Sequence, residues 1–238
     1  MLRFPNPGSD IDHFVRIFQA VFPTLSIYQN FDLDDISAAL VAQNLATSSG
    51  HMGIEALKRS TRADRSKDPL YNQSKSYSEL YRLLGWIHPT ADSQLVFTFT
   101  YLGAHVAEAL QDPRALVLEC ILGVAYPNPI VKVKGDHKLR PFVTFLRTMS
   151  DMDSILSRDE LIVGPMSLSD DRDTEEYNGM IDKLREIRGS KSRINEEMAL
   201  LSNARKILRV TMGNYTRFPL AVLKWSGWAK LDFARHAA

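Results

Sequence analysis

Apolar residues recur every three or four positions through much of the chain, which predicts short helices separated by polar breaks. Residues 10–22 follow this spacing, and Asp10 stands in the N-cap position. A second helix is expected over residues 34–46, capped by Asp34 or Asp35 and ended by the glycines of SSGHMG. The chain is therefore expected to open with two helices.

The stretch KSYSELYRLLGWIHP, residues 75–89, predicts a short amphipathic helix that stops at a glycine. Ser74 or Ser76 is a candidate N-cap, and Gly85 is expected in the left-handed conformation that ends helices. LVFTFTYL, residues 95–102, alternates apolar and polar side chains and predicts a strand. A helix followed by a hairpin is the layout of a winged-helix domain.

The second half begins after a proline-rich break, YPNPIVKVKGDHKLRP, which predicts a domain boundary. Pro141 is expected to open a helix, and SRDE, residues 157–160, is a candidate capping box. A long amphipathic helix is expected over about residues 195–212. A final short helix is expected from Pro219 to a second Gly-Trp step at Gly227.

The two halves echo each other, since each ends a short helix at Gly-Trp where a hairpin is expected to begin. The expected fold class is mainly α with small β wings, an α+β chain of tandem winged-helix (helix-turn-helix) domains. The first domain is expected over residues 1–128, with the N-terminal helices and a basic segment. The second is expected over residues 129–238, with a wing that ends before a returning strand. Trp86 and Trp228 are expected as core residues at the two corners.

Composition narrows the classes of function. The 238 residues are 45% hydrophobic and carry a net charge of +1, which argues against a uniformly basic surface but allows a basic patch. The single cysteine, Cys120, lies in an apolar run and excludes a disulfide framework or a cysteine zinc site. No HExxH motif, signal-peptide pattern or long apolar span is present, so neither a metal site nor a membrane partner is expected.

Longer motifs resemble a known family. SYSELYRLLGWIHPTADSQLVFTFTYLGAHVAEAL is similar to the first recognition domain of type IIS restriction endonucleases of the FokI and AlwI group. PFVTFLRTMSDMDSILSRDELIV is similar to the start of that family's second winged-helix domain, and NYTRFPLAVLKWSGWAKL to its recognition helix. The resemblance covers about residues 70–230 in order.

The resemblance implies a module that recognises a short asymmetric site in duplex DNA, as part of a restriction-modification system in the cytoplasm of a prokaryotic cell. In that family a separate hydrolase domain of the PD-(D/E)xK nuclease type, dependent on Mg²⁺, cuts the DNA. No such domain is expected after Trp228, so the chain is expected to be a fragment, a truncated gene product or one part of a split enzyme. It is expected to be a monomer without a cofactor of its own, and Mg²⁺ is expected only for a separate nuclease domain or subunit.

The expected helix that ends at Gly85 offers candidate base contacts. The major groove of DNA admits an α-helix, and each base pair presents its own hydrogen-bond donors and acceptors there. Arg82 is a candidate partner for guanine. The alternative is that Tyr81 and Arg82 belong to an ordinary solvated helix face. The candidates in this helix are Tyr77, Ser78, Tyr81 and Arg82.

The segment from Lys58 to Lys75 carries more basic than acidic residues, which favours contact with DNA phosphates over a merely solvated face. Its candidate phosphate contacts are Arg59, Arg62, Arg65, Lys67 and Lys75.

The second candidate set surrounds the last short helix. Asn214 and Arg217 have the side-chain types that pair with the edges of adenine and guanine, and Lys224 is expected to contact the phosphate backbone of DNA. The alternative is that Asn214 and Thr216 serve as an N-cap and turn. The full set is Asn214, Tyr215, Thr216, Arg217 and Lys224.

Two other classes of function remain open. A winged-helix transcriptional regulator or DNA-binding scaffold without a nuclease partner is the alternative to a restriction module. A third possibility is a small nuclease using Asp112 with Asp136-x-Lys138, but Asp112 precedes Pro113 at an expected helix start and Asp136 lies in the proline-flanked break. No catalytic residue is therefore assigned.

Overall fold

The computed structural model describes residues 1–5, 10–48, 51–59, 67–109, 112–128, 130 and 137–230. The chain divides into two compact units, one of Asp10–Cys120 and one of Ile121–Ala238 together with Met1–Ser9. The boundary lies eight residues before the expected one, and the N-terminal segment belongs with the second unit. Both units are mainly helical and the first holds a small antiparallel sheet, which confirms the α+β class.

The first unit opens with α1 (Ile11–Leu25), and Asp10 caps it by accepting a hydrogen bond from the backbone N–H of His13, as predicted. Helix α2 (Leu33–Ala42) follows after a two-residue strand. Its N-cap is Asp32, which forms a reciprocal capping box with Asp35, so the predicted caps lie within the first turn instead. The helix begins earlier because Asp32 accepts two backbone N–H groups.

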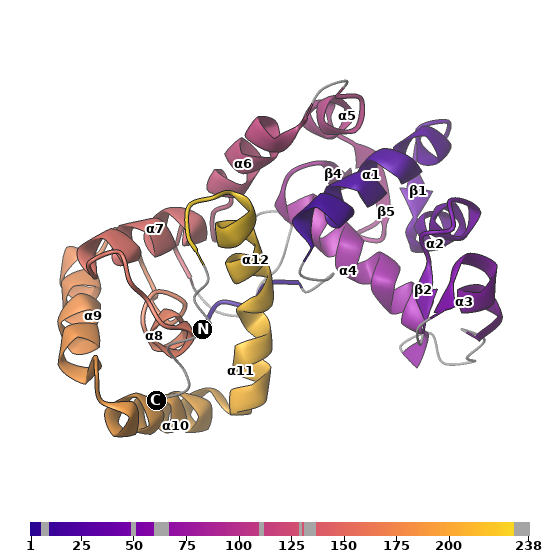
Figure 1. The fold of residues 1–238 in the computed structure, drawn as a ribbon. Coiled ribbons are helices and arrows are strands. Elements are labelled where there is room, and N and C mark those ends of the chain that lie inside the picture. Colours follow the sequence, from indigo (N-terminus) through magenta and orange to yellow (C-terminus); the bar gives the residue numbers. More distant parts are fainter. Residues whose placement is uncertain are drawn as a thin grey trace. The chain divides into compact units, whose positions relative to one another are not determined.

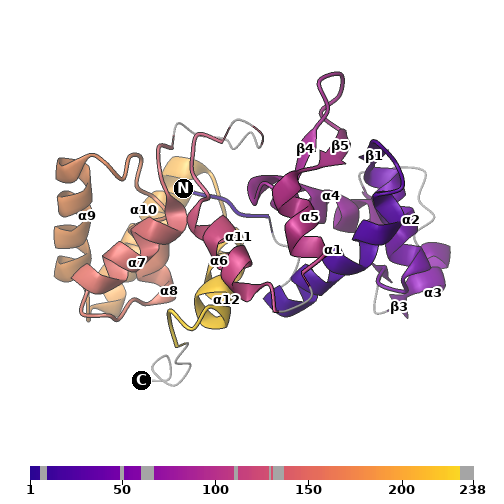
Figure 2. The same ribbon diagram turned by 90° about the horizontal axis from the view of Figure 1, so that it is seen from above.

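The sheet joins strands that are far apart in the sequence. Strand β1 (Phe31–Asp32) pairs antiparallel with β5 (Val96–Phe99), which pairs antiparallel with β4 (Ile87–Pro89), in the order β1-β5-β4 (Figure 1). The predicted β4–β5 hairpin is thus confirmed, and its connecting loop projects beyond the helices of the unit (Figure 2). A second small hairpin pairs β2 (Thr47–Ser48) with β3 (His51–Met52).

Helix α4 (Pro69–Leu83) is the helix expected to end at Gly-Trp, but it begins earlier than predicted. Asp68 caps it and Pro69 occupies the first turn, where a missing N–H costs nothing. The proposed start at Ser74 or Ser76 is therefore wrong, because both residues lie inside the helix. The remaining helices of the first unit are α3 (Gly53–Arg59) and α5 (Tyr101–Ala107), and α6 (Arg114–Leu122) crosses the unit boundary near its end.

The Gly85-Trp86 corner fixes the hairpin to α4. Gly85 has a φ of +73°, as predicted, and Trp86 is fully buried. The hydroxyl of Thr100 donates to the carbonyls of Gly85 (2.6 Å) and Trp86 (3.1 Å) and accepts the backbone N–H of Gly103 (2.9 Å). One threonine side chain thereby holds the corner to the start of α5.

The second unit is entirely helical within its described residues, apart from an isolated bridge between Lys138 and Asp170 (Figures 1 and 2). Pro141 opens its first full helix and Ser157 with Glu160 forms the capping box of another, both as predicted. Its helices are α7 (Pro141–Asp151), α8 (Arg158–Val163), α9 (Thr174–Ile187), α10 (Lys191–Arg205), α11 (Arg209–Tyr215) and α12 (Arg217–Trp225).

The predicted long helix over residues 195–212 is interrupted. Lys206 adopts a left-handed conformation (φ 54°, ψ 42°) that ends α10, and α11 starts three residues later. In Figure 1, α11 leaves the end of α10 at a sharp angle. A lysine gives no sign of this break, because lysine is a good helix former.

The core of the second unit includes the N-terminal segment. The ring of Phe4 lies 5.7 Å from that of Phe142, 6.4 Å from Phe145 and 5.9 Å from Phe218. The backbone N–H of Leu2 donates to the carbonyl of Met166. These contacts explain why the first residues belong to the second unit.

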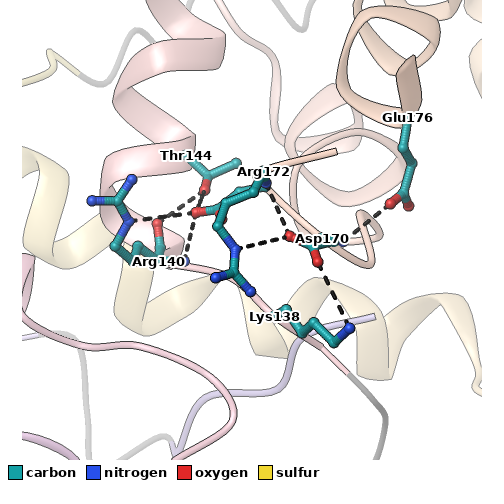
Figure 3. A network of polar contacts seen from close by, with 7 residues as sticks. Lys138, Arg140, Thr144, Asp170, Arg172 and Glu176 are labelled. Atoms are coloured by element: carbon teal, nitrogen blue, oxygen red, sulfur yellow. Dashed lines mark hydrogen bonds and ion pairs between the residues drawn. The ribbon is translucent and has the colours of Figure 1, made fainter. Parts of the chain in front are cut away.

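A polar network ties residues 137–144 to the loop between α8 and α9 (Figure 3). Asp171 accepts the backbone N–H of Arg140 (2.8 Å) and the hydroxyl of Thr144 (3.2 Å), while Glu176 accepts the backbone N–H of Asp170 (3.0 Å). Lys138 and Arg172 both lie within ion-pair distance of Asp170. Asp170, Asp171 and Glu176 thus stabilise the loop between α8 and α9 against residues 138–144.

The second Gly-Trp corner matches the first in backbone conformation. Gly227 has a φ of +77° after the end of α12, and Trp228 is half-buried. Residues 231–238, where a second wing was expected to continue, lie outside the described residues. Within the described part of the chain, no helix combines the length and apolar character that crossing a membrane requires.

Candidate nucleic-acid interface

Helix α4 turns most of its predicted base contacts inward. Tyr77, Ser78 and Tyr81 are 3%, 1% and 2% exposed, so the prediction that they face a DNA groove is wrong. The Tyr81 ring packs against those of Phe14, Phe18 and Trp86, with ring centroids 4.7–5.7 Å apart. Aromatic hydroxyl residues serve the core here because their rings bury large apolar areas.

The hydroxyl groups on this inner face are held within the protein. Ser78 donates to the carbonyl of Lys75 (2.9 Å), and burial raises the pKa of Tyr77 and raises that of Tyr81 further. The Tyr81 hydroxyl has no hydrogen-bond partner among the described residues. Neutral, buried phenols of this kind have no path to a ligand outside the protein.

The outward face of α4 carries a different set of side chains. Asn72 and Lys75 are exposed, and Ser76, Glu79 and Arg82 are partly exposed. Asn72, Lys75, Glu79 and Arg82 are spaced by three, four and three residues, which places them along one side of the helix, and Ser76 adjoins them. Lys75 and Arg82 are the two predicted contacts that belong to this side.

Arg82 is anchored rather than free. Its guanidinium carbon lies 5.4 Å from the ring centre of Phe97, and its Nε donates to the carbonyl of Ser78 (3.2 Å). Burial lowers the pKa of Arg82. The guanidinium must leave the Phe97 ring before it can reach a base edge.

The basic segment before α4 is only partly described. Lys58 is exposed and donates to Glu55 (3.1 Å), and Lys67 is exposed next to the α4 cap. Arg62 and Arg65 lie outside the described residues, as does the side chain of Arg59. The predicted phosphate contacts of this segment therefore reduce to Lys67 and Lys75 in the described structure.

The second predicted set falls at the turn between α11 and α12. Thr216 is fully buried, so the prediction that it contacts DNA is wrong. Its hydroxyl accepts a hydrogen bond from Arg158 Nε (2.9 Å) and donates one to the carbonyl of Gly213 (2.8 Å). Asn214 and Tyr215 are half-buried at the end of α11. Arg217 and Lys224 are exposed on α12, as base or phosphate contact requires.

A charge pattern identifies a larger basic surface than the predicted residues. Residues 198–231 contain no Asp or Glu. This acid-free segment covers the end of α10 and all of α11 and α12. Six cations in it are exposed: Arg205, Lys206, Arg209, Arg217, Lys224 and Lys230. Among them Arg209 lies 2.9 Å from Asp159 of α8.

The two units differ in net charge. The first unit holds 9 Lys and Arg against 13 Asp and Glu, and the second holds 20 against 15. Residues 83–113, which include the β4–β5 hairpin, contain no Lys or Arg. The net positive charge of the chain therefore belongs to the second unit, a distribution that the net charge of +1 for the whole chain conceals.

The structure describes one of the two candidate nuclease carboxylates. Asp112 accepts the backbone N–H of Arg114 (3.0 Å) at the start of α6, as a helix cap, and Asp136 lies outside the described residues. Among the described residues, no group of three or more His, Cys, Asp or Glu side chains is placed to hold a metal ion.

Comparison with protein-family models, with curated proteins and with solved structures gave no match to this chain.

Proposed function

We propose that this chain binds duplex DNA at a short asymmetric site through two winged-helix units. The observation that carries this proposal is the order of elements in the first unit. Helices α1, α2 and α4 are followed by the β4–β5 hairpin, and β1 completes a sheet of order β1-β5-β4. This is the order of a winged-helix domain, in which the helix before the hairpin enters the major groove.

The outward side of α4 has the chemistry for base contact. Asn72 has the amide that pairs with adenine, and Lys75 has the ammonium that reaches guanine acceptors. The stripe also includes Glu79, whose carboxylate accepts from the amino group of cytosine. Asn72 thus replaces the inward-facing tyrosines as the leading candidate for base recognition on this helix.

The acid-free segment supplies the electrostatic part of the proposed interface. Arg217 and Lys224 are exposed on α12, which ends at a left-handed glycine as α4 does. Cations that neutralise phosphates release counterions and give affinity that falls steeply with salt. In this proposal the first unit recognises bases, and the second binds the backbone and contributes its own base contacts.

The resemblance to type IIS restriction endonucleases defines the biological setting of the proposal. The chain acts as the recognition module of a restriction system, and a separate Mg²⁺-dependent nuclease domain or subunit performs hydrolysis. A transcriptional regulator would instead be expected to dimerise and to prefer a palindrome.

Selection from a randomised duplex pool tests the recognition claim. Purified chain is incubated with the pool at about 0.1 M salt, where phosphate contacts still contribute, and bound duplexes are sequenced over several rounds. An enriched non-palindromic motif is the expected result. Enrichment of an inverted repeat would favour the regulator, and a pool that stays random would refute sequence-specific recognition.

Charge reversal on α12 tests the electrostatic claim. The double substitution Arg217→Glu with Lys224→Glu is expected to weaken binding to the selected duplex at least tenfold and to flatten its dependence on salt, since about two phosphate contacts are lost. The measurement is fluorescence anisotropy across a salt series.

Lys191→Glu is the matched control, because Lys191 is exposed in the same unit but lies outside the acid-free segment. It is expected to change affinity less than about threefold at the same salt. Equal losses in the control and the double variant would mean that general charge, rather than the α12 surface, drives binding.

A further inference from the structure

The connection between α2 and α4 is longer than the turn that joins the two helices of a helix-turn-helix pair. Such a turn has about three or four residues, whereas residues 43–68 separate these two helices. The described part of this connection forms the β2–β3 hairpin and α3. Figure 1 shows β2 beside one end of α4, so the hairpin lies where a short turn would otherwise be.

The β2–β3 hairpin is anchored to both α2 and α4. The backbone N–H of Ala46 donates to the carbonyl of Leu40 in α2 (3.0 Å), and the backbone N–H of Gly53 donates to the carbonyl of Ala46 (2.7 Å). The backbone N–H of Thr47 donates to Oε1 of Gln73 in α4 (3.0 Å). These hydrogen bonds close the base of the hairpin and fix its position beside the N-terminal half of α4.

Met52 shares a surface with this part of α4. In the β2–β3 pair Met52 stands directly opposite Thr47, and opposite residues of an antiparallel pair project from the same face. Thr47 is hydrogen-bonded to Gln73, which follows Asn72 in the chain. Met52, Thr47 and Asn72 are all exposed. An unbroken series of neighbours therefore joins Met52 to the leading candidate for base recognition.

Met52 adds an apolar contact to a polar surface. Its side chain is 49% exposed, and its neighbours Thr47, Gln73 and Asn72 are hydrogen-bonding residues. The exposed Lys67 next to the α4 cap adds positive charge, which suits a phosphate backbone nearby. A methionine side chain is flexible and polarisable, so it adapts its shape to an apolar partner.

The methyl group of thymine is the partner that fits an apolar side chain at this place. Among the four unmodified bases, thymine alone presents an apolar group, its C5-methyl, at the major-groove edge. The other groups on that edge are hydrogen-bond donors and acceptors, which a thioether matches poorly. A protein interface buries about 20–30 residues on each side, and the two short strands offer too small a surface for one.

We propose that Met52 contacts the C5-methyl group of a thymine in the base pair adjoining those contacted by α4, so that the β2–β3 hairpin lengthens the recognised site at that end. The inference rests on the proposed DNA binding by α4, since the first residues of the second helix of a helix-turn-helix pair contact base edges. A hairpin fixed beside those residues reaches the next base pair along the groove. Asn72 and Met52 then recognise neighbouring positions, one by hydrogen bonds and the other by apolar contact.

Replacing thymine by deoxyuridine tests this contact, because deoxyuridine lacks only the methyl group. Each thymine of the duplex selected from the randomised pool is replaced in turn, and the affinity of the full chain is measured by fluorescence anisotropy. Loss of one thymine methyl group at an end of the selected site is expected to weaken binding about fourfold, the effect of leaving one methyl group unburied. In Met52→Ser the same replacement is expected to change the affinity by less than about 1.5-fold, since the partner of the methyl group is already lost.

Two further variants complete the comparison. Met52→Leu keeps an apolar side chain and is expected to retain the difference in affinity between thymine and deoxyuridine. Ile27→Ser is the matched control, because it removes an aliphatic side chain that is 73% exposed in the turn after α1, and it is expected to behave as the unchanged chain does.

The outcomes separate this inference from the proposed function. A selected site in which no thymine distinguishes the unchanged chain from Met52→Ser, including a site without thymine, would overturn the inference and leave the proposed function standing. A pool that stays random would overturn both.

Discussion

Replacing Gly103 with alanine is expected to destabilise the first unit by about 3 kcal/mol or more, because the added methyl group has no space. A Cβ at this position would lie 2.0 Å from the carbonyl oxygen of Trp86 and 3.0 Å from its Cα. Both are backbone atoms, so no side-chain rotation relieves the overlap. The start of α5 must separate from the Gly85-Trp86 corner, which disrupts the hydrogen bonds of Thr100.

The comparison variant is Gly179→Ala in α9, where nothing lies within 4 Å of an added Cβ. That change is expected to stabilise the second unit by up to about 1 kcal/mol, since alanine is the better helix former. Amide hydrogen exchange, followed by mass spectrometry, measures the protection of backbone amides in each unit separately. Faster exchange in peptides spanning β4 and β5 for Gly103→Ala alone is the expected result, and unchanged protection there would contradict the proposed role of the close contact.

Signals that act within a few residues were predictable from the sequence. Asp10 as a cap, Pro141 as a first-turn residue and the Ser157–Glu160 box all occupy the positions that their local chemistry favours. Gly85 and Gly227 both adopt the left-handed conformation. A capping side chain accepts a hydrogen bond from a backbone N–H at the start of a helix, and a glycine without a side chain can adopt the left-handed conformation that ends one.

Signals that depend on distant partners were not predictable. Strand β1 is two residues long and exists because Phe31 pairs with Phe97, more than sixty residues away. Tyr77 and Tyr81 read as polar groove contacts, yet the aromatic side chains of α1 and the corner bury them. Since a tyrosine has both an apolar ring and a polar tip, its direction is decided by the packing around it.

The start of α4 shows how one wrong boundary moves a candidate site. With Asp68 as the cap, Pro69 opens the helix before the expected start at Ser74 or Ser76. The longer helix includes Asn72 and Lys75, which are exposed, whereas Tyr77 and Ser78 are buried in the core. The acid-free segment, in contrast, is visible in the sequence itself and was missed because charge was summed over the whole chain.

The second unit depends on a buried acid at the start of α8. The Glu160 side chain is 5% exposed, and its Oε1 accepts from Arg188 Nε at 2.9 Å. Its Oε2 accepts the backbone N–H of Ser157 at 2.6 Å. Arg188 in turn donates to the carbonyls of Met152 and Ile155, so one arginine joins the end of α9 to the loop before α8.

Glu160→Ala is therefore expected to destabilise the second unit by about 3 kcal/mol, because it leaves a partly buried guanidinium without its carboxylate and removes half of the capping box. Asp159→Ala is the matched control: the neighbouring acid is 34% exposed and pairs with Arg209 at the surface, so a loss of under about 1 kcal/mol is expected. Urea unfolding of both variants, with hydrogen exchange in α8 and α9, gives the comparison. Equal losses for the two acids would show that Glu160 acts only as a surface charge and that the Arg188 contacts do not hold the unit together.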